Sequence, residues 1–338
     1  MTEVLDRPLA LALQGGGSHG ALTWGVLDRL LEAGMRQAGL SGTSAGALNA
    51  AALASGWAVD GARGARSALQ ALWSGIGGMN PSVRPSWSAD GSLHSATLKT
   101  MTRVASPYQF NPAGFNPLRQ LLATVIDWEA LRAPRQPPLC VAATEVATGR
   151  LRLFQRHELN VEMLLASSCI PTLFRAVEID GKAYWDGGFA ANPALLSLVM
   201  NAESSDLMLI QLLPERAETM APRQVDGILN RSRELGFSTH LLRELHWLAT
   251  LQADGGPLTR WSPSRLRRRV ARLRFHHLDG GGELASHGEP SPLDTASPSL
   301  EALHRAGREA GQRWLRDHGH CVGRFSSRPL SAFAGLDG

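Results

Sequence analysis

Residues 8–55 decide the fold, and they read PLALALQGGGSHGALTWGVLDRLLEAGMRQAGLSGTSAGALNAAALAS. The apolar run from Pro8 to Gln14 predicts a short buried strand, and the spacing of apolar residues over 18–33 predicts an amphipathic helix. A second short strand ends around residues 39–41, and the Ala- and Leu-rich residues 45–55 predict a second helix. Strands that alternate with helices indicate a layered α/β fold.

The second strand and the second helix are joined by Gly42-Thr43-Ser44-Ala45-Gly46, a G-x-S-x-G pentapeptide. Such a pentapeptide places its serine on a tight turn, where the flanking glycines avoid clashes and the hydroxyl points to solvent. The start of a helix also has free N–H groups and a dipole that favour developing negative charge. Ser44 is therefore a candidate nucleophile, although a serine in such a turn can also serve only as a helix cap.

The first strand and the first helix are joined by a glycine-rich loop, GGGSHG at residues 15–20. A run of glycines lets the backbone approach a ligand closely and aim several N–H groups at one point, which suits an oxyanion or a phosphate. Gly15, Gly16 and Gly17 together with Ala45 are the candidate oxyanion hole. The N–H groups of Gly16, Gly17 and Ala45 are the candidate donors.

The same loop also matches a dinucleotide-binding fingerprint, through the spacing Gly15-x-Gly17-x-x-Gly20. That fingerprint needs an acidic residue at the tip of the second strand, about 20 residues further on. Residues 40–43 occupy this place and read LSGT. A nucleotide-binding protein is therefore an alternative that the sequence does not favour.

A third motif, Asp186-Gly187-Gly188, begins 142 residues after the candidate nucleophile. It ends residues 178–188, which predict a two-stranded ribbon with an Asp-Gly turn. Asn192-Pro193 then predicts the start of a helix, so ordered elements bracket the loop and can hold a carboxylate in place. Asp-Gly-Gly alone is more typical of a surface turn, and its significance depends on the other two motifs.

In order and spacing, the motifs at 15–20, 42–46 and 186–188 resemble those of the patatin-like phospholipase family of serine acyl hydrolases, and the likeness covers roughly residues 8–215. The resemblance implies a three-layer α/β/α fold with a mostly parallel central sheet. It also implies a Ser–Asp dyad without histidine, in which Ser44 is the nucleophile and Asp186 the base. His19 stands where the family usually has arginine.

Such a dyad is chemically reasonable although aspartate is a weak base, with a reference pKa of about 3.9. No free alkoxide is needed if the serine proton leaves while the carbonyl is attacked and backbone donors hold the oxyanion. The protonated Asp186 can then give its proton to the leaving alcohol, and the same carboxylate can activate the water that releases the acyl group.

A Ser-His-Asp triad esterase is the mechanistic alternative. His276 and His277 are its natural candidates, since they follow a strand predicted at residues 271–275. We interpret both histidines as structural because they lie outside the region of resemblance.

The composition indicates a globular enzyme. The chain has 338 residues, of which 43% are hydrophobic and 19% charged, and its mean hydropathy is −0.11. Cys140, Cys169 and Cys321 share no pair spacing, so we expect neither a disulfide framework nor a zinc site, and no metal or cofactor. Residues 1–8 lack a basic and apolar leader, and no run approaches about 18 apolar residues. We expect a cytoplasmic protein with at most peripheral membrane contact.

The predicted organisation is an N-terminal tail at 1–7, a catalytic domain at 8–215 and a helical C-terminal extension at 216–338. Within the catalytic domain, residues 79–117 place aromatic residues on an irregular segment, which suits a lid insertion. Residues 164–174, LLASSCIPTLF, suit either the floor of a pocket or the core.

The segment from Arg265 to Arg274, RLRRRVARLR, is the main source of the net charge of +4. As an amphipathic helix it suits peripheral contact with an anionic membrane, and equally a solvated face or a subunit contact. Nucleic acid is not expected, because no aromatic residues interleave the arginines. Residues 279–299 predict a mobile loop and 301–317 a closing helix. An oligomer is an open alternative.

The sequence thus predicts a serine acyl-ester hydrolase of lipase, phospholipase or esterase type that acts on lipid or other hydrophobic esters. An intracellular polyester depolymerase and a catalytically silent lipid-binding module are alternatives with the same fold. The sequence leaves the head group, the acyl chain length and the choice between hydrolysis and acyl transfer open.

Overall fold

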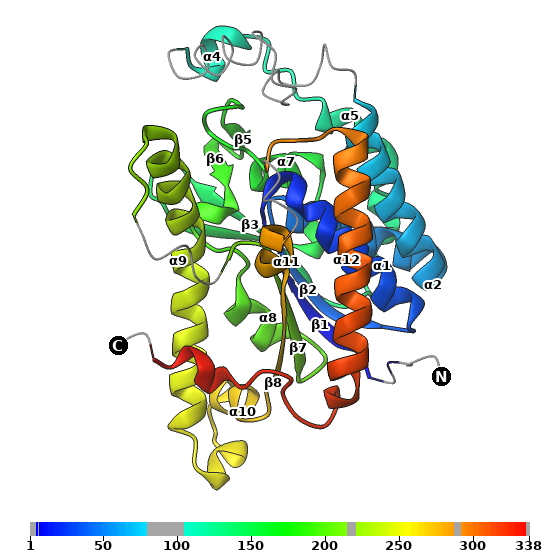
Figure 1. Ribbon diagram of the computed structural model, residues 1–338, viewed down its shortest axis with the longest axis vertical. Helices are drawn as coiled ribbons and strands as arrows, with labels where there is room; N and C mark the ends of the chain where they lie inside the picture. Colours follow the sequence, from blue (N-terminus) through cyan, green and yellow to red (C-terminus); the bar gives the residue numbers. More distant parts are fainter. Residues whose placement is uncertain (1–4, 6, 80–104, 215–220, 287–291, 336–338) are drawn as a thin grey trace.

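The structure is a computed structural model that describes residues 5, 7–79, 105–214, 221–286 and 292–335. In these residues the fold is built on one central sheet of eight strands (Figure 1). The strand order is β5-β6-β3-β2-β1-β7-β8, and β4 pairs with β3 outside this path. The strands are β1 (Leu9–Leu13), β2 (Gln37–Thr43), β3 (Leu139–Glu145), β4 (Leu151–Gln155), β5 (Val177–Ile179), β6 (Lys182–Asp186), β7 (Asp206–Gln211) and β8 (Arg274–Asp279).

The sheet is mostly parallel. The pairs β1–β2, β2–β3, β1–β7 and β7–β8 are all parallel. The pairs β3–β4, β3–β6 and β5–β6 at one edge are antiparallel. Because the parallel strands point the same way, their carboxyl ends meet at one edge of the sheet, where the loops that follow β1 and β2 lie side by side.

Helices cover both faces of the sheet, with α1, α2 and α12 on one side and α8, α9 and α10 on the other (Figure 1). The longer helices are α1 (Gly20–Glu32), α2 (Ala45–Gly78), α5 (Leu118–Val125), α9 (Val225–Ala253) and α12 (Ser297–His318). The shorter ones are α4 (Pro107–Phe110), α6 (Trp128–Arg132), α7 (Val161–Ser167), α8 (Leu195–Asn201), α10 (Arg265–Ala271) and α11 (Gly280–Ser286).

Strand β1 shows why the fold has three layers. Its five residues are all buried, which fits a parallel strand covered on both faces. Leu9, Leu11 and Leu13 belong to the apolar cluster shared with α1, α2 and α12. Ala10 and Ala12 point to the other face and join the cluster of α8 and α9. The arrangement confirms the α/β/α architecture with a mostly parallel sheet.

The helix predicted at residues 45–55 is longer in the structure, since α2 extends to Gly78. Its helical geometry is interrupted at Asp60 and Gly61, where the backbone dihedrals are not helical. The second part continues because Leu69, Leu72 and Trp73 are buried in the core. Local sequence patterns did not predict this tertiary burial.

The prediction of a mobile loop at residues 279–299 is wrong over much of that range. Residues Gly280–Ser286 form α11, and α12 already begins at Ser297. Leu284 anchors α11 in the core, and Pro298 at the first turn of α12 favours helix initiation. Residues 287–291 lie outside the described residues. The strand predicted at residues 271–275 overlaps β8 only at Arg274 and Phe275, because Ala271 still belongs to α10 and β8 continues through His276 and His277 to Asp279. The C-terminal part of the chain therefore adds an edge strand to the sheet as well as helices.

Most of the possible lid, residues 80–104 within 79–117, lies outside the described residues. The part that follows contains α4, whose Tyr108 and Phe110 are exposed, and Phe115, which is 60% exposed. No helix in the described part of the chain is long and apolar enough to cross a membrane.

Candidate active site

Ser44 lies between the end of β2 at Thr43 and the start of α2 at Ala45. Its backbone dihedrals are φ 54° and ψ −127°, a left-handed conformation that is strained for a residue with a side chain. The turn is tight because a side-chain carbon at Gly46 would lie 2.1 Å from the Leu13 carbonyl oxygen at the end of β1. Only glycine fits this close approach of α2 to β1.

A hydrogen bond from α7 holds the strained turn. The backbone N–H of Ser44 donates to the Ser167 hydroxyl oxygen at 3.0 Å. Ser167 is completely buried in the apolar stretch that the sequence assigned to a pocket floor or the core. A serine inside an apolar run is the only local signal for this role, and it does not distinguish Ser167 from an ordinary core serine.

The glycine loop, residues 15–20, lies directly against the candidate nucleophile. A side-chain carbon at Gly15 would be 2.8 Å from the Ser44 Cβ atom and 2.7 Å from the Thr43 carbonyl oxygen. In the described part of the chain, the N–H groups of Gly16 and Gly17 make no hydrogen bond. The N–H of Ala45 belongs to the first turn of α2, where no intrahelical acceptor exists. These three N–H groups are available as oxyanion donors.

Asn192 fixes the glycine loop to the other side of the site. Its side-chain oxygen accepts a hydrogen bond from the Gly15 N–H at 2.7 Å, and its side-chain nitrogen donates to the Phe237 carbonyl oxygen at 3.3 Å. The Gln14 side chain donates to the Asn192 carbonyl oxygen at 3.4 Å. From the sequence, Asn192 is predicted only to start a helix, because its hydrogen-bond partners are distant in the chain.

Asp186 ends β6, and its carboxyl group is completely buried. Its Oδ1 atom accepts a hydrogen bond from the Gly188 N–H at 2.8 Å, and its backbone N–H donates to the Cys169 carbonyl oxygen at 2.8 Å. Its Oδ2 atom is also buried, and no described residue forms a hydrogen bond with it. One oxygen thus orients the carboxyl group, and the other remains available for a proton.

Burial raises the pKa of Asp186 to about 7, because the charged form loses its hydration. The Gly188 N–H and the Ser44 side chain oppose this change and lower the pKa. The Ser44 side chain thus affects this pKa, although Oδ2 has no formed hydrogen bond among the described residues. A carboxyl group with this pKa is divided between its two protonation states near neutral pH, as a general base or acid requires.

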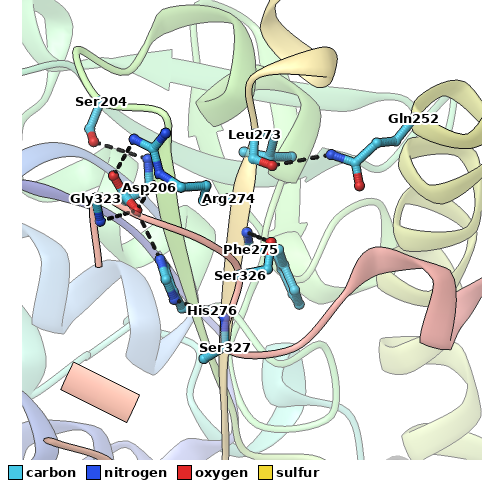
Figure 2. A network of polar contacts seen from close by, with 10 residues as sticks. All are labelled: Ser204, Asp206, Gln252, Leu273, Arg274, Phe275, His276, Gly323, Ser326 and Ser327. Atoms are coloured by element: carbon cyan, nitrogen blue, oxygen red, sulfur yellow. Dashed lines mark hydrogen bonds and ion pairs between the residues drawn. The ribbon is translucent and has the colours of Figure 1, made fainter. Parts of the chain in front are cut away.

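The two candidate triad histidines lie on β8, at the edge of the sheet and three strands away from β2. Strands about 4.8 Å apart give a separation of roughly 14 Å. Figure 2 shows that His276 binds Asp206 and Ser327, through its Nε2 atom at 3.0 Å from the Asp206 Oδ1 atom and its Nδ1 atom at 3.3 Å from the Ser327 nitrogen. His277 Nε2 lies 3.1 Å from the Gln211 Oε1 atom. These contacts support a structural role.

His19 ends the short 3-10 helix of the glycine loop, Gly17–His19, and the following Gly20 begins α1. Within the residues that the structure describes, no group of three or more His, Cys, Asp or Glu side chains is arranged to hold a metal ion.

A family model described as patatin-like phospholipase matches residues 11–199, which are more than half of the 338 residues. The match contains the glycine loop, Ser44 and Asp186. The chain is also similar to a solved structure, the crystal structure of VipD from Legionella pneumophila, with a TM-score of 0.45. The two are 14% identical, and the alignment covers 92% of this chain and 67% of that one. No match was found among the curated proteins.

Proposed function

Because the chain belongs to the patatin-like phospholipase family, whose members are lipid acyl hydrolases, we propose that it cleaves lipid or other hydrophobic esters through an acyl-Ser44 intermediate. In this proposal Asp186 is the general base. The observation that carries it is the completely buried Asp186 carboxyl group, whose Oδ2 atom has no hydrogen-bond partner among the described residues and whose pKa is lowered by the Ser44 side chain.

The first step forms the acyl-enzyme. The Ser44 oxygen attacks the ester carbonyl carbon while its proton passes to Asp186 Oδ2. A carboxylate with a pKa near 7 takes this proton more readily than one with the ordinary value. The raised pKa therefore compensates in part for the absence of a histidine in the proposed dyad.

The negative charge on the carbonyl oxygen is stabilised by the backbone. The N–H groups of Gly16, Gly17 and Ala45 are the proposed donors, and the N-terminus of α2 adds the favourable end of its dipole. Each donor of this kind typically lowers the barrier by a few kcal/mol. The glycine loop is then as important for the rate as the base.

The protonated Asp186 next donates its proton to the leaving alkoxide, and the free alcohol departs. In the second half of the cycle the carboxylate removes a proton from water, which attacks the acyl-Ser44 carbonyl. Asp186 finally returns that proton to the Ser44 oxygen, so the enzyme is regenerated and one water is consumed for each ester cleaved.

The test is hydrolysis of p-nitrophenyl esters from acetate to palmitate by Ser44→Ala, Asp186→Asn and a matched control, Asp180→Asn. Asp180 lies on the exposed turn of the same β5–β6 hairpin and has φ 52°, a conformation that asparagine tolerates. We expect kcat to fall about 10³-fold or more in both dyad variants and to stay normal in the control. Near-normal activity of Asp186→Asn would show that another group is the base.

A further inference from the structure

The outward face of the N-terminal half of α9 carries four exposed aliphatic side chains around Ser232. We call Val225, Ile228, Leu229 and Leu235 the α9 stripe, and their exposed fractions are 68%, 46%, 50% and 49%. Their spacing places them along one face of the helix. The buried residues of α9 lie further along the helix and on its opposite side, where Leu241 and Leu245 pack in the cluster that contains residues of β1, β7 and β8. Packing in the core therefore does not explain why the residues of the stripe are apolar.

The helix that carries the stripe is fixed to the Asp186 loop. The Phe237 ring packs onto Gly188, where a side-chain carbon would lie 2.2 Å from the ring. The Phe237 and Phe189 ring centroids are 4.8 Å apart in an edge-to-face contact. Phe237 also accepts the hydrogen bond from Asn192, which in turn holds the glycine loop. In Figure 1 this half of α9 lies beside β6, the strand that ends at Asp186. The stripe is thus next to the candidate active site.

The chemistry of the stripe fits a lipid surface. Branched aliphatic side chains suit the boundary between head groups and acyl chains, and neighbouring arginines suit phosphate groups. Arg223 and Arg233 are exposed beside the stripe, and Arg231 lies 3.0 Å from Glu234 in an ion pair. We propose that the α9 stripe docks the protein onto a phospholipid bilayer, with the Asp186 loop close to the membrane. The proposal rests on the proposed function, which makes a lipid ester the substrate.

The basic segment 265–274 is the competing surface. Its arginines are largely used inside the protein, because Arg269 donates to the Val199 and Ala202 carbonyl oxygens and Arg265 to that of Met200. Arg274 pairs with Asp206, as Figure 2 shows. Helix α10 also contacts the far end of α9, through Gln252. It lies away from the stripe and from the Asp186 loop (Figure 1).

The first experiment is flotation with phosphatidylcholine vesicles, with and without phosphatidylglycerol, in a Ser44→Ala background that leaves the lipid intact. The stripe variant is Ile228→Glu with Leu235→Glu, and the control is Arg267→Glu with Arg272→Glu, which changes the net charge more. We expect the stripe variant to bind vesicles about tenfold more weakly or worse, and the control to keep most of its binding. If only the control loses binding, the basic segment is the docking surface and the proposal is wrong.

A second measurement does not depend on a loss of binding. The three native cysteines are buried, so Ile228→Cys can be labelled selectively with a polarity-sensitive dye. We expect a blue shift of its emission on vesicles, and no shift for Ala302→Cys on the exposed side of α12. Unshifted emission at residue 228, or a wild-type dimer that the stripe variant converts to a monomer, would overturn the proposal.

The outcomes separate docking from catalysis. The stripe variant in the active enzyme should hydrolyse p-nitrophenyl acetate at nearly the wild-type rate and lose activity only on vesicles. If the wild type cleaves soluble esters but the stripe variant still binds vesicles normally, docking through α9 is wrong and the proposed function stands. If the wild type binds vesicles through the stripe but cleaves no ester, docking through α9 stands and the proposed function is wrong.

Discussion

Replacing Asp186 by Asn should change stability and activity in opposite directions, and the difference should depend on pH. In the folded protein the pKa of Asp186 is raised from 3.8 to about 7 by burial. Between these two values the unfolded chain has lost a proton that the folded protein keeps. The folded state therefore binds more protons, and the free energy of unfolding falls as the pH rises through this range.

The magnitude follows from the pKa change. Each unit corresponds to about 1.4 kcal/mol, so ionised Asp186 costs about 4 kcal/mol of stability above pH 7 compared with its neutral form. Asparagine has the same shape and never ionises. We expect the Asp186→Asn variant and the wild type to be similarly stable near pH 4, and the variant to be more stable by up to about 4 kcal/mol at pH 8.

The assay is urea unfolding of both proteins at several pH values between 4 and 8, together with kcat/KM on a soluble ester. The activity of the wild type should fall about tenfold for each unit below pH 7, because only the carboxylate accepts the serine proton. A stability difference that does not change with pH, or full activity at pH 5, would refute the assignment of a buried carboxylate with a raised pKa at this position.

Three further predictions concern the groups around the dyad and the polar network of Figure 2. Gly15→Ala should reduce kcat about 100-fold without preventing folding, as measured by ester hydrolysis and thermal unfolding, because the added carbon would be 2.8 Å from Ser44 Cβ and would displace the loop. Ser167→Ala leaves the Ser44 N–H unpaired and should cost about 1–3 kcal/mol in urea unfolding, with a lower kcat and an unchanged KM; Ser168→Ala is its neighbouring control. Asp206→Ala should lower the Tm strongly, since it removes the partner of Arg274 and His276, yet leave kcat/KM at a permissive temperature unchanged; equal losses of both would place the network in the active site. The same network lowers the pKa of Asp206, so the stability that it provides should be lost as the pH falls.

The elements next to the motifs could be predicted from the sequence because their signals are local. A run of alternating Leu and Ala before three glycines defines β1, and an Ala-rich segment after the G-x-S-x-G turn defines the start of α2. The nucleophile candidate Ser44 and the base candidate Asp186 were identified by their motifs, and the fold then brings them together.

The supporting residues could not be predicted, because their roles depend on contacts far apart in the sequence. Ser167 is 123 positions from Ser44, and Asn192 is 177 positions from Gly15. Neither residue has a local pattern that distinguishes it from a helix serine or a helix start. The length of α2 was missed for a related reason, since burial of Leu69 and Trp73 outweighs the break at Gly61.

The most direct test of the dyad is covalent labelling with a fluorophosphonate, followed by peptide mapping and by the labelling rate from pH 5 to 8. We predict a single adduct on Ser44 and a labelling rate that rises up to about pH 7 and then levels off. In Asp186→Asn we predict a labelling rate that is lower by at least about 100-fold. Labelling of a different residue, or an equal rate in Asp186→Asn, would contradict the assignment of Ser44 and Asp186 as nucleophile and base.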